Sequence, residues 1–197
     1  MNELIAFFKQ YVEFTDSELA FIKGNTKIID IPKNELILKE GDVSTAFYFI
    51  IKGCVRMYYL NDGEEKTAYF YMENDFVSSY QSFTKQLPAK HNLATVEDSQ
   101  LVVFDLESVM KFTSYSSKFE FLARVIMEDE LAVYQDIISA FVTQNAEQRY
   151  LDLLQHKPQL IQRIPQHQIA TFLGVTAETL SRIRSRMRRG CCASMRM

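Results

Sequence analysis

The sequence predicts an α+β protein: an N-terminal antiparallel β-roll of the jelly-roll type, then a long helix and a C-terminal helix-turn-helix. Short β-branched and aromatic runs separated by turn residues fill residues 26–105. Apolar residues then recur at threes and fours over 116–144, and residues 166–183 have the spacing of a helix-turn-helix. We therefore divide the chain at 1–115, 116–144 and 145–197.

The composition is that of an ordinary globular protein. The 197 residues are 47% hydrophobic and 24% charged, enough for a sizeable core. The longest apolar run, residues 46–51, is far shorter than the ~20 residues of a membrane span, and no basic region precedes the first apolar residues, so we expect neither a transmembrane helix nor a signal peptide. Three cysteines, Cys54 and the adjacent Cys191 and Cys192, fit neither a disulfide framework nor a zinc site, which favours a reducing cytoplasm.

Positive charge is concentrated at the end of the sequence. Residues 178–197 hold six arginines and one acid, Glu178, which gives a local net charge of +5. Because the whole chain has a net charge of −3, residues 1–177 carry a net charge of −8. A weakly acidic body with a local arginine cluster favours contact with a polyanion on one part of the surface. A solvated basic tail is the alternative.

Two short helices are expected to open the fold. Apolar residues three and four apart run from Leu4 to Tyr11. Thr15 and Glu18 then have the spacing of a capping box, in which each side chain bonds the other residue's backbone amide, and a second apolar run follows them.

Strands follow at a spacing of roughly 8–12 residues, which is typical of antiparallel sandwiches and rolls. We expect them at residues 27–31, 35–38, 47–51, 55–60, 66–72, 92–96 and 101–104. Asn61-Asp62-Gly63 is the clearest hairpin turn, because Asn and Gly tolerate the positive φ of tight turns. The long polar stretch 78–91 is expected to be a functional loop.

Residues 116–144 contain neither Gly nor Pro and are expected to form one helix of about 28 residues, or ~42 Å. Its apolar stripe consists of Phe119, Leu122, Ile126, Val133, Ile137, Ala140 and Phe141. A helix of this length with one apolar stripe often pairs with its twin in a homodimer. Packing against the chain's own β domain is the alternative, and Glu130, near the stripe, argues against a pure coiled coil.

The helix-turn-helix is the most informative segment. Ala170 is small where two helices would cross, and Gly174 stands where the turn needs a positive φ. Val175, Leu180 and Ile183 are placed to seal a small core. The spacings of four, six and three from Ala170 to Ile183 therefore predict a helix-turn-helix.

The second helix of this motif carries the candidate base-reading residues. Thr176 is expected to cap it, so that its first turns, which enter a major groove, present Ala177, Glu178, Ser181 and Arg182. Glu178 suits the amino group of cytosine, and Arg182 suits O6 and N7 of guanine. The arginines that suit phosphate contact are Arg184, Arg186, Arg188 and Arg189. Alternatively, Glu178 and Arg182 form an i,i+4 ion pair.

This arrangement resembles the Crp/Fnr family of bacterial transcription regulators over nearly the whole chain. The motif from residue 169 reads Ile-Ala-x-Phe-Leu-Gly-Val-Thr-x-Glu-Thr-Leu-Ser-Arg-Ile. Residues 37–42 and 47–56 are similar to the family's cyclic-nucleotide-binding-type domain, and 145–151 to the start of its DNA-binding domain. Glu178, Ser181 and Arg182 are closest to an Fnr-like recognition helix, which implies half-sites similar to TTGA.

The resemblance implies a sensor domain at 1–115, a dimerisation helix at 116–144 and a winged helix-turn-helix, the DNA-binding domain, at 145–197. The implied protein is a cytoplasmic transcription regulator. Its implied partners are double-stranded DNA, a second copy of the chain, RNA polymerase and an unidentified small-molecule effector, with no membrane.

Family members that bind cyclic AMP hold its ribose with a Gly-Glu pair and its phosphate with an Arg. The corresponding residues 75–92 contain no Gly, Glu or Arg, so we expect no cofactor and a sensor that does not bind cyclic AMP. A lysine of this segment can supply one positive charge to the phosphate, so binding of cyclic AMP is kept as an alternative. The candidate effector pocket consists of Ser78, Ser79, Lys85, Lys90 and His91. Three cysteines cannot hold the iron–sulfur cluster of the family's oxygen sensors, and haem on His91 is an alternative to a solvated loop histidine.

Two other classes of function are weighed against a transcription regulator. One is a small-molecule sensor whose helix-turn-helix serves mainly protein contact. The other is an enzyme with a cupin-like β-roll, which would need clustered His and Glu ligands on the strands. The sequence shows no such cluster and no catalytic motif, so we expect no metal site and no catalytic residues.

Overall fold

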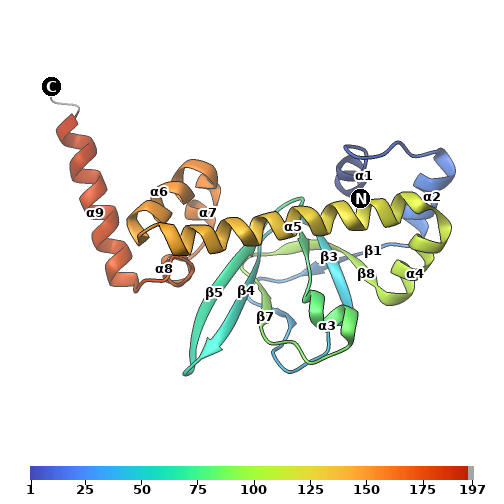
Figure 1. The fold of residues 1–197 in the computed structure, drawn as a ribbon, viewed down its shortest axis with the longest axis horizontal. Helices are drawn as coiled ribbons and strands as arrows, with labels where there is room; N and C mark the ends of the chain where they lie inside the picture. The colour runs from blue at the N-terminus through green and yellow to red at the C-terminus, as the bar shows by residue number, and fades with distance from the viewer. Residues whose placement is uncertain (195–197) are drawn as a thin grey trace. The chain divides into compact units, whose positions relative to one another are not determined.

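The computed structural model describes residues 1–194, with side chains through Met187. Its helices are α1 (Asn2–Phe8), α2 (Asp16–Gly24), α3 (Tyr80–Lys85), α4 (Leu106–Tyr115), α5 (Ser117–Thr143), α6 (Ala146–His156), α7 (Pro158–Arg163), α8 (Gln166–Phe172) and α9 (Ala177–Ser194). Its strands are β1 (Lys27–Ile31), β2 (Leu36–Leu38), β3 (Ala46–Lys52), β4 (Val55–Asn61), β5 (Glu64–Tyr71), β6 (Phe76–Val77), β7 (Asn92–Thr95) and β8 (Ser99–Asp105). The predicted α+β fold class is confirmed (Figure 1).

The chain forms two compact units. The first contains residues 1–59 and 69–132, and the second contains residues 60–68 together with the residues from 133 onward. The division falls within α5 and also assigns the tip of the β4–β5 hairpin to the second unit.

The β domain consists of two four-stranded antiparallel sheets, with strand orders β1-β8-β3-β6 and β2-β7-β4-β5. The predicted strands lie within a few residues of their expected bounds, whereas β6 and α3 were not predicted. The helix α3 forms inside the stretch expected to be a loop, because Phe83 anchors it in the core. Gln86, which follows the helix as its C-cap, has a left-handed φ of 53°.

The hairpin between β4 and β5 turns where the sequence predicts. The left-handed residues are Asp62, with φ 53°, and Gly63, with φ 79°. Two consecutive positive φ values match the right-handed twist of the two strands, which makes this pair the common hairpin solution. Asn61 is the last residue of β4 and is not left-handed.

The core of the first unit is built from α1, α2, β3, β8, α4 and the start of α5. Its buried members are Leu4, Ile5, Phe8, Ile22, Phe49, Val102, Phe104, Phe112, Phe119 and Leu122. Aromatic rings dominate it, for example Phe47 stacked on Phe104 with centroids 4.8 Å apart. Such pairs add about 0.5–1.5 kcal/mol each beyond the area they bury.

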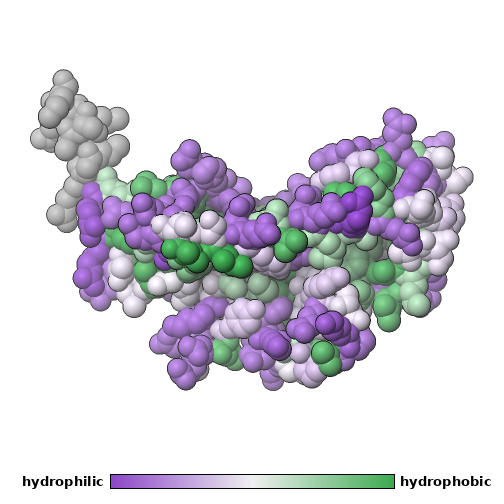
Figure 2. Space-filling view, in the orientation of Figure 1, coloured by the Kyte–Doolittle hydropathy of each residue, from purple (hydrophilic) through white to green (hydrophobic). Residues whose placement is uncertain are grey.

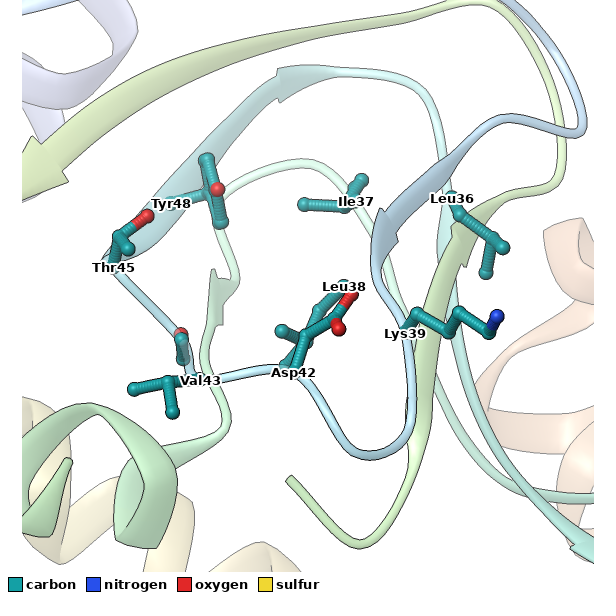
Figure 3. A pocket seen from close by; sticks show the side chains of 9 residues that line it. Leu36, Ile37, Leu38, Lys39, Asp42, Val43, Thr45 and Tyr48 are labelled. Carbon is teal, nitrogen blue, oxygen red and sulfur yellow. The ribbon is translucent and has the colours of Figure 1, made fainter. Parts of the chain in front are cut away.

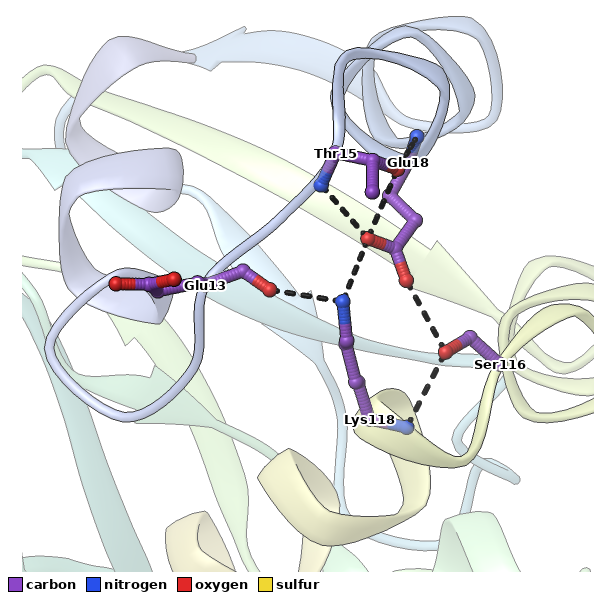
Figure 4. Close-up of polar contacts among 5 residues, drawn as sticks. All are labelled: Glu13, Thr15, Glu18, Ser116 and Lys118. Atoms are coloured by element: carbon purple, nitrogen blue, oxygen red, sulfur yellow. Dashed lines mark hydrogen bonds and ion pairs between the residues drawn. The ribbon is translucent and has the colours of Figure 1, made fainter.

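The N-terminal helices are tied to α5 by a polar network around Glu18 (Figure 4). The predicted capping box is confirmed: Thr15 N donates to Glu18 Oε2 at 2.8 Å, and Glu18 N donates to Thr15 Oγ1 at 3.3 Å. Lys118 Nζ, from the start of α5, donates to Glu18 Oε2 and to the Glu13 carbonyl, each at 2.8 Å. Ser116 donates to the other carboxylate oxygen at 3.2 Å.

The long helix is confirmed as α5, which has 27 residues. Phe119 and Leu122 of the predicted stripe are buried in the core of the first unit, with Ile126 packed against them. The first part of that stripe therefore packs on the chain's own β domain.

After α5 the described chain consists of four helices, α6 to α9, and the short turns between them. The described residues from 144 to 194 contain no strand, so the wing implied by the resemblance is not seen among them. Pro158 stands in the first turn of α7, where its fixed φ favours a helix. The side chains of Arg188, Cys191 and Cys192 lie outside the described residues.

Candidate nucleic-acid interface

The helix-turn-helix consists of α8, a four-residue turn and α9. The turn is closed by two backbone hydrogen bonds, from Gly174 N to Thr171 O at 3.0 Å and from Val175 N to Ala170 O at 2.9 Å. Gly174 has the predicted positive φ, 71°. Ala170 is buried at the helix crossing, as the spacing predicts, whereas Val175 is only half-buried.

A small core holds α9 against the other helices of its unit. Leu180 and Ile183 of α9 are buried, as predicted. Their buried companions are Tyr150, Leu153, Leu160, Ile164, Ile169 and Leu173. With its apolar side turned into this core, α9 presents its polar side to solvent.

The first turn of α9 is capped by Thr176. Its hydroxyl accepts from Thr179 N at 3.2 Å and is hydrogen-bonded to the Thr179 hydroxyl at 3.0 Å, which satisfies one of the free amides at the helix start. The four residues that follow on the same surface are exposed: Ala177, Glu178, Ser181 and Arg182. The cap and the core thus hold the predicted base-reading side chains on one open face.

Two arginines of α9, Arg182 and Arg186, are ion-paired with acids in the structure. Arg182 Nη2 lies 3.1 Å from Glu178 Oε1, the i,i+4 pair given as the alternative. Arg186 Nη1 lies 2.9 Å from Oε2 of Glu147, in the first turn of α6. No local pattern predicts the second pair, because its members are 39 residues apart in the sequence.

Arg149 is a further residue of this region that sequence reasoning did not single out. It is half-buried on α6 and donates to two backbone carbonyls, Gln144 O at 2.6 Å and Leu173 O at 2.8 Å. Its guanidinium carbon lies 4.5 Å from the centroid of the Phe141 ring. One feature of the sequence could have indicated it: Arg149 is the one arginine of the α6 segment and directly precedes Tyr150, which is buried together with Leu153.

The hairpin tip also contacts the helix-turn-helix within the second unit. The hydroxyls of Thr67, on β5, and Thr171, on α8, are hydrogen-bonded at 2.9 Å. Thr67 is buried, and its amide donates to Thr171 Oγ1 at 3.4 Å. This contact joins residues 104 apart in sequence and was not predicted.

A second apolar stripe runs along α5 on its exposed side. Leu131, Ile138 and Val142 are 58%, 63% and 78% exposed, and Figure 2 shows hydrophobic surface along this helix. At about 100° per residue these three lie within a narrow sector, roughly opposite to Leu122. Glu130 does not interrupt this stripe, because its carboxylate accepts from the Tyr71 hydroxyl at 3.5 Å.

The residues of the candidate effector pocket differ in how far they are buried. Ser79 is buried at the start of α3, Ser78 is half-buried, and Lys85 and Lys90 are exposed. His91 is half-buried, and burial lowers the pKa of its imidazole. Its Nε2 is buried without a hydrogen-bond partner among the described residues.

One pocket in the same β domain is lined by other residues than the predicted ones (Figure 3). It has a volume of about 210 Å³ and is lined by Leu36, Ile37, Leu38, Lys39, Asp42, Val43, Ser44, Thr45 and Tyr48. Burial raises the pKa of the Tyr48 hydroxyl, which remains a neutral donor. None of the five predicted effector residues lines this pocket.

The described residues contain no group of three or more His, Cys, Asp or Glu side chains placed to hold a metal ion. Within the same residues, no helix has the length and apolar character needed to cross a membrane.

A jelly-roll-like β domain, a long helix and a helix-turn-helix, in this order, define the fold of the Crp/Fnr regulators. Residues 28–116 match the cyclic nucleotide-binding domain family. The chain is 22% identical over 171 residues to the anaerobic regulatory protein of Aggregatibacter actinomycetemcomitans. That alignment covers 81% of this chain and 66% of the relative, slightly less than two thirds of its length.

Solved structures share this fold. FixK2 from Bradyrhizobium japonicum superimposes with a TM-score of 0.71 at 20% identity, covering 84% of this chain and 85% of FixK2. The c-di-GMP-responsive global regulator CLP of Xanthomonas campestris gives 0.71 at 17% identity, covering 89% of this chain and 93% of CLP. The predicted resemblance to Crp/Fnr regulators is therefore confirmed.

Proposed function

We propose that this chain is a sequence-specific, DNA-binding transcription regulator that acts in the cytoplasm as a homodimer. The observation that carries the proposal is the exposed face of α9, where Thr176 caps the helix and Glu178, Ser181 and Arg182 project from its first turns. The start of a recognition helix is the part that reaches base edges in a major groove. The exposed Arg186 adds a charge suited to phosphate.

The second stripe of α5 supports dimerisation with another copy of the chain. Leu131, Ile138 and Val142 are spaced by seven and four residues, as on the contact face of paired helices. They lie away from the side of α5 that carries the buried Phe119 and Leu122. A two-fold pair would present two copies of α9 to half-sites about one DNA turn apart, ~34 Å.

For the sensor domain, we propose an effector other than cyclic AMP. The cyclic phosphate needs a planar, two-pronged donor, and the stretch that corresponds to the family's phosphate-binding segment offers only lysines, which are exposed. The buried Ala89 of this stretch has no polar side chain. The residues present therefore do not fit cyclic AMP, and the relative CLP, which responds to c-di-GMP, shows that other ligands occur on this fold.

Selection of bound duplexes from a randomised pool, with and without cyclic AMP, tests this function. We expect a two-fold symmetric site in both arms, with half-sites similar to TTGA. A site recovered only with cyclic AMP would overturn the effector proposal. An absence of enrichment together with binding that hardly changes with salt would overturn DNA reading and favour a helix-turn-helix that contacts protein.

A further inference from the structure

Arg149 connects the end of α5 to the turn of the helix-turn-helix. Its Nη1 donates to the carbonyl of Gln144, directly after α5, at 2.6 Å. Its Nη2 donates to the carbonyl of Leu173, between α8 and α9, at 2.8 Å. One guanidinium therefore links the two segments whose relative position determines where α9 stands on α5.

The same side chain is packed against the last turn of α5. The guanidinium carbon lies 4.5 Å from the centroid of the Phe141 ring, within cation–π distance. A Cβ on Gly174 would lie 3.1 Å from Phe141 Cε1 and 3.6 Å from Arg149 Nη2. The ring, the guanidinium and the turn are thus in close contact, and a small movement of the turn would disturb both partners.

The joint between α5 and α6 is fixed independently of Arg149. Asn145 and Gln148 form a capping box, with backbone-to-side-chain bonds of 2.8 and 3.0 Å. Gln144 Nε2 donates to Asp152 Oδ2 at 2.6 Å. The direction of α6 therefore does not depend on Arg149, which leaves the turn between α8 and α9 as the element that Arg149 holds.

A lysine cannot reproduce this link. Arginine presents donors in a rigid planar fork, which can reach two carbonyls while its face lies on an aromatic ring. The ammonium of lysine is a compact point charge on a flexible stem, so it would satisfy one carbonyl and leave the ring. The conservative change to lysine therefore removes the link and keeps the charge.

We propose that Arg149 is a positioning residue that sets the distance between the two recognition helices of the dimer, and hence the half-site spacing that the protein accepts. This inference rests on the proposed dimeric DNA-binding function. If α5 holds the two copies together and Arg149 holds the turn before α9 on α5, the two copies of α9 are kept at a fixed distance from each other. Without the link, each helix-turn-helix can adjust to its own half-site.

The test compares the full-length protein with Arg149→Lys on a duplex series. The duplexes carry the selected half-sites at the selected spacing and at spacings one or two base pairs longer or shorter. Each base pair shifts one half-site by ~3.4 Å and rotates it by about 34°. We expect the unchanged protein to prefer its own spacing by ~10-fold or more, and Arg149→Lys to reduce this preference to about threefold or less with half-site affinity retained.

Arg163→Lys is the matched control, because Arg163 is also half-buried in the second unit but lies at the end of α7. It should keep the spacing preference of the unchanged protein. An Arg149→Lys protein that discriminates spacings as sharply as the unchanged protein would overturn the inference. Equal losses on single half-sites and on full sites would also overturn it, because they would place the effect within one helix-turn-helix. Failure of the unchanged protein to bind any duplex would instead refute the proposed function itself.

Discussion

Arg186 of α9 is ion-paired with Glu147, whose carboxylate lies in the first turn of α6, at 2.9 Å. Arg186 is 69% exposed, so the pair is open to solvent and to other anions. A carboxylate and a DNA phosphate are alternative partners for the same guanidinium. In the free protein, one of the arginines suited to phosphate is therefore already occupied by an acid of the same chain.

Removing the charge of Glu147 should strengthen DNA binding. In Glu147→Gln, Arg186 does not have to leave a carboxylate before it binds a DNA phosphate. The affinity for all duplexes should therefore rise by about two- to fivefold, which corresponds to the free energy of an exposed ion pair. The salt dependence should become steeper, because the variant releases more counterions from DNA. Titration of a specific and a random duplex at several salt concentrations measures both effects.

Glu107→Gln is the matched control for this change. Glu107 also lies in the first turn of a helix and pairs with Lys111 at 2.7 Å, but it belongs to the first unit. Its variant should bind DNA as the unchanged protein does. Unchanged or weaker binding by Glu147→Gln would show that Arg186 does not contact phosphate.

A charge on the exposed stripe of α5 should break the dimer. Ile138→Glu would bury a carboxylate between two helices, so we expect dimerisation to weaken by ~100-fold or more, with an unchanged circular dichroism spectrum. Sedimentation velocity at micromolar concentration measures the association. Ala132→Glu, which is exposed and about 80° or more away from each residue of the stripe, is the control. A fully dimeric Ile138→Glu protein would exclude this stripe as the interface.

Gly174→Ala should destabilise the protein. The alanine would have to adopt φ 71° and place its Cβ 3.1 Å from Phe141 Cε1, which costs about 1–3 kcal/mol in the free energy of unfolding. Chemical denaturation measures this loss. Gly24→Ala is the matched control, since Gly24 ends α2 with open space around it, and its alanine should stabilise the helix by up to ~1 kcal/mol. Equal effects of both substitutions would contradict the assigned strain.

The network around Glu18 makes stability depend on acidic pH. The hydrogen bond from Lys118 and the bond from the Thr15 amide lower the pKa of Glu18 from 4.5 to about 2. Because the folded state binds this proton less readily than the unfolded state, the stabilisation is complete above pH 4.5 and is lost as the pH falls towards 2. In Glu18→Gln, stability at neutral pH should be lower and this part of the acid dependence should disappear.

Glu13→Gln is the control for the loss of stability at acidic pH. Glu13 contributes its backbone carbonyl to Lys118, and its carboxylate points away from the network (Figure 4). Thermal unfolding between pH 2 and 7 should give the same profile for this variant as for the unchanged protein. If Glu18→Gln loses stability at acidic pH to the same extent as the unchanged protein, Glu18 is not the cause of that loss.

The sequence predicted those elements whose signals are local. The Thr15–Glu18 cap, the hairpin turn at Asp62 and Gly63, and the positive φ of Gly174 each depend on residues within a few positions. The helix α3 was missed, because its stretch is polar except for the buried Phe83.

Contacts that unite distant segments could not be predicted. Thr67 with Thr171, Glu147 with Arg186 and Arg149 with Leu173 join residues 104, 39 and 24 apart. Nothing in the spacing of one helix shows which carbonyl or acid a neighbouring element will offer. The exposed face at the start of α9 was therefore predictable, and the contacts that hold this helix in place were not.

Methylation interference at guanine N7 tests the central claim most directly. The selected duplex is methylated sparsely in its major groove, and bound and free fractions are compared base by base. A dimer reading DNA through Arg182 predicts two symmetric guanines, about one turn or ~34 Å apart, whose methylation blocks binding, and the loss of both signals in Arg182→Ala. A single guanine, or no interference at any position, would contradict a two-fold reader that uses α9.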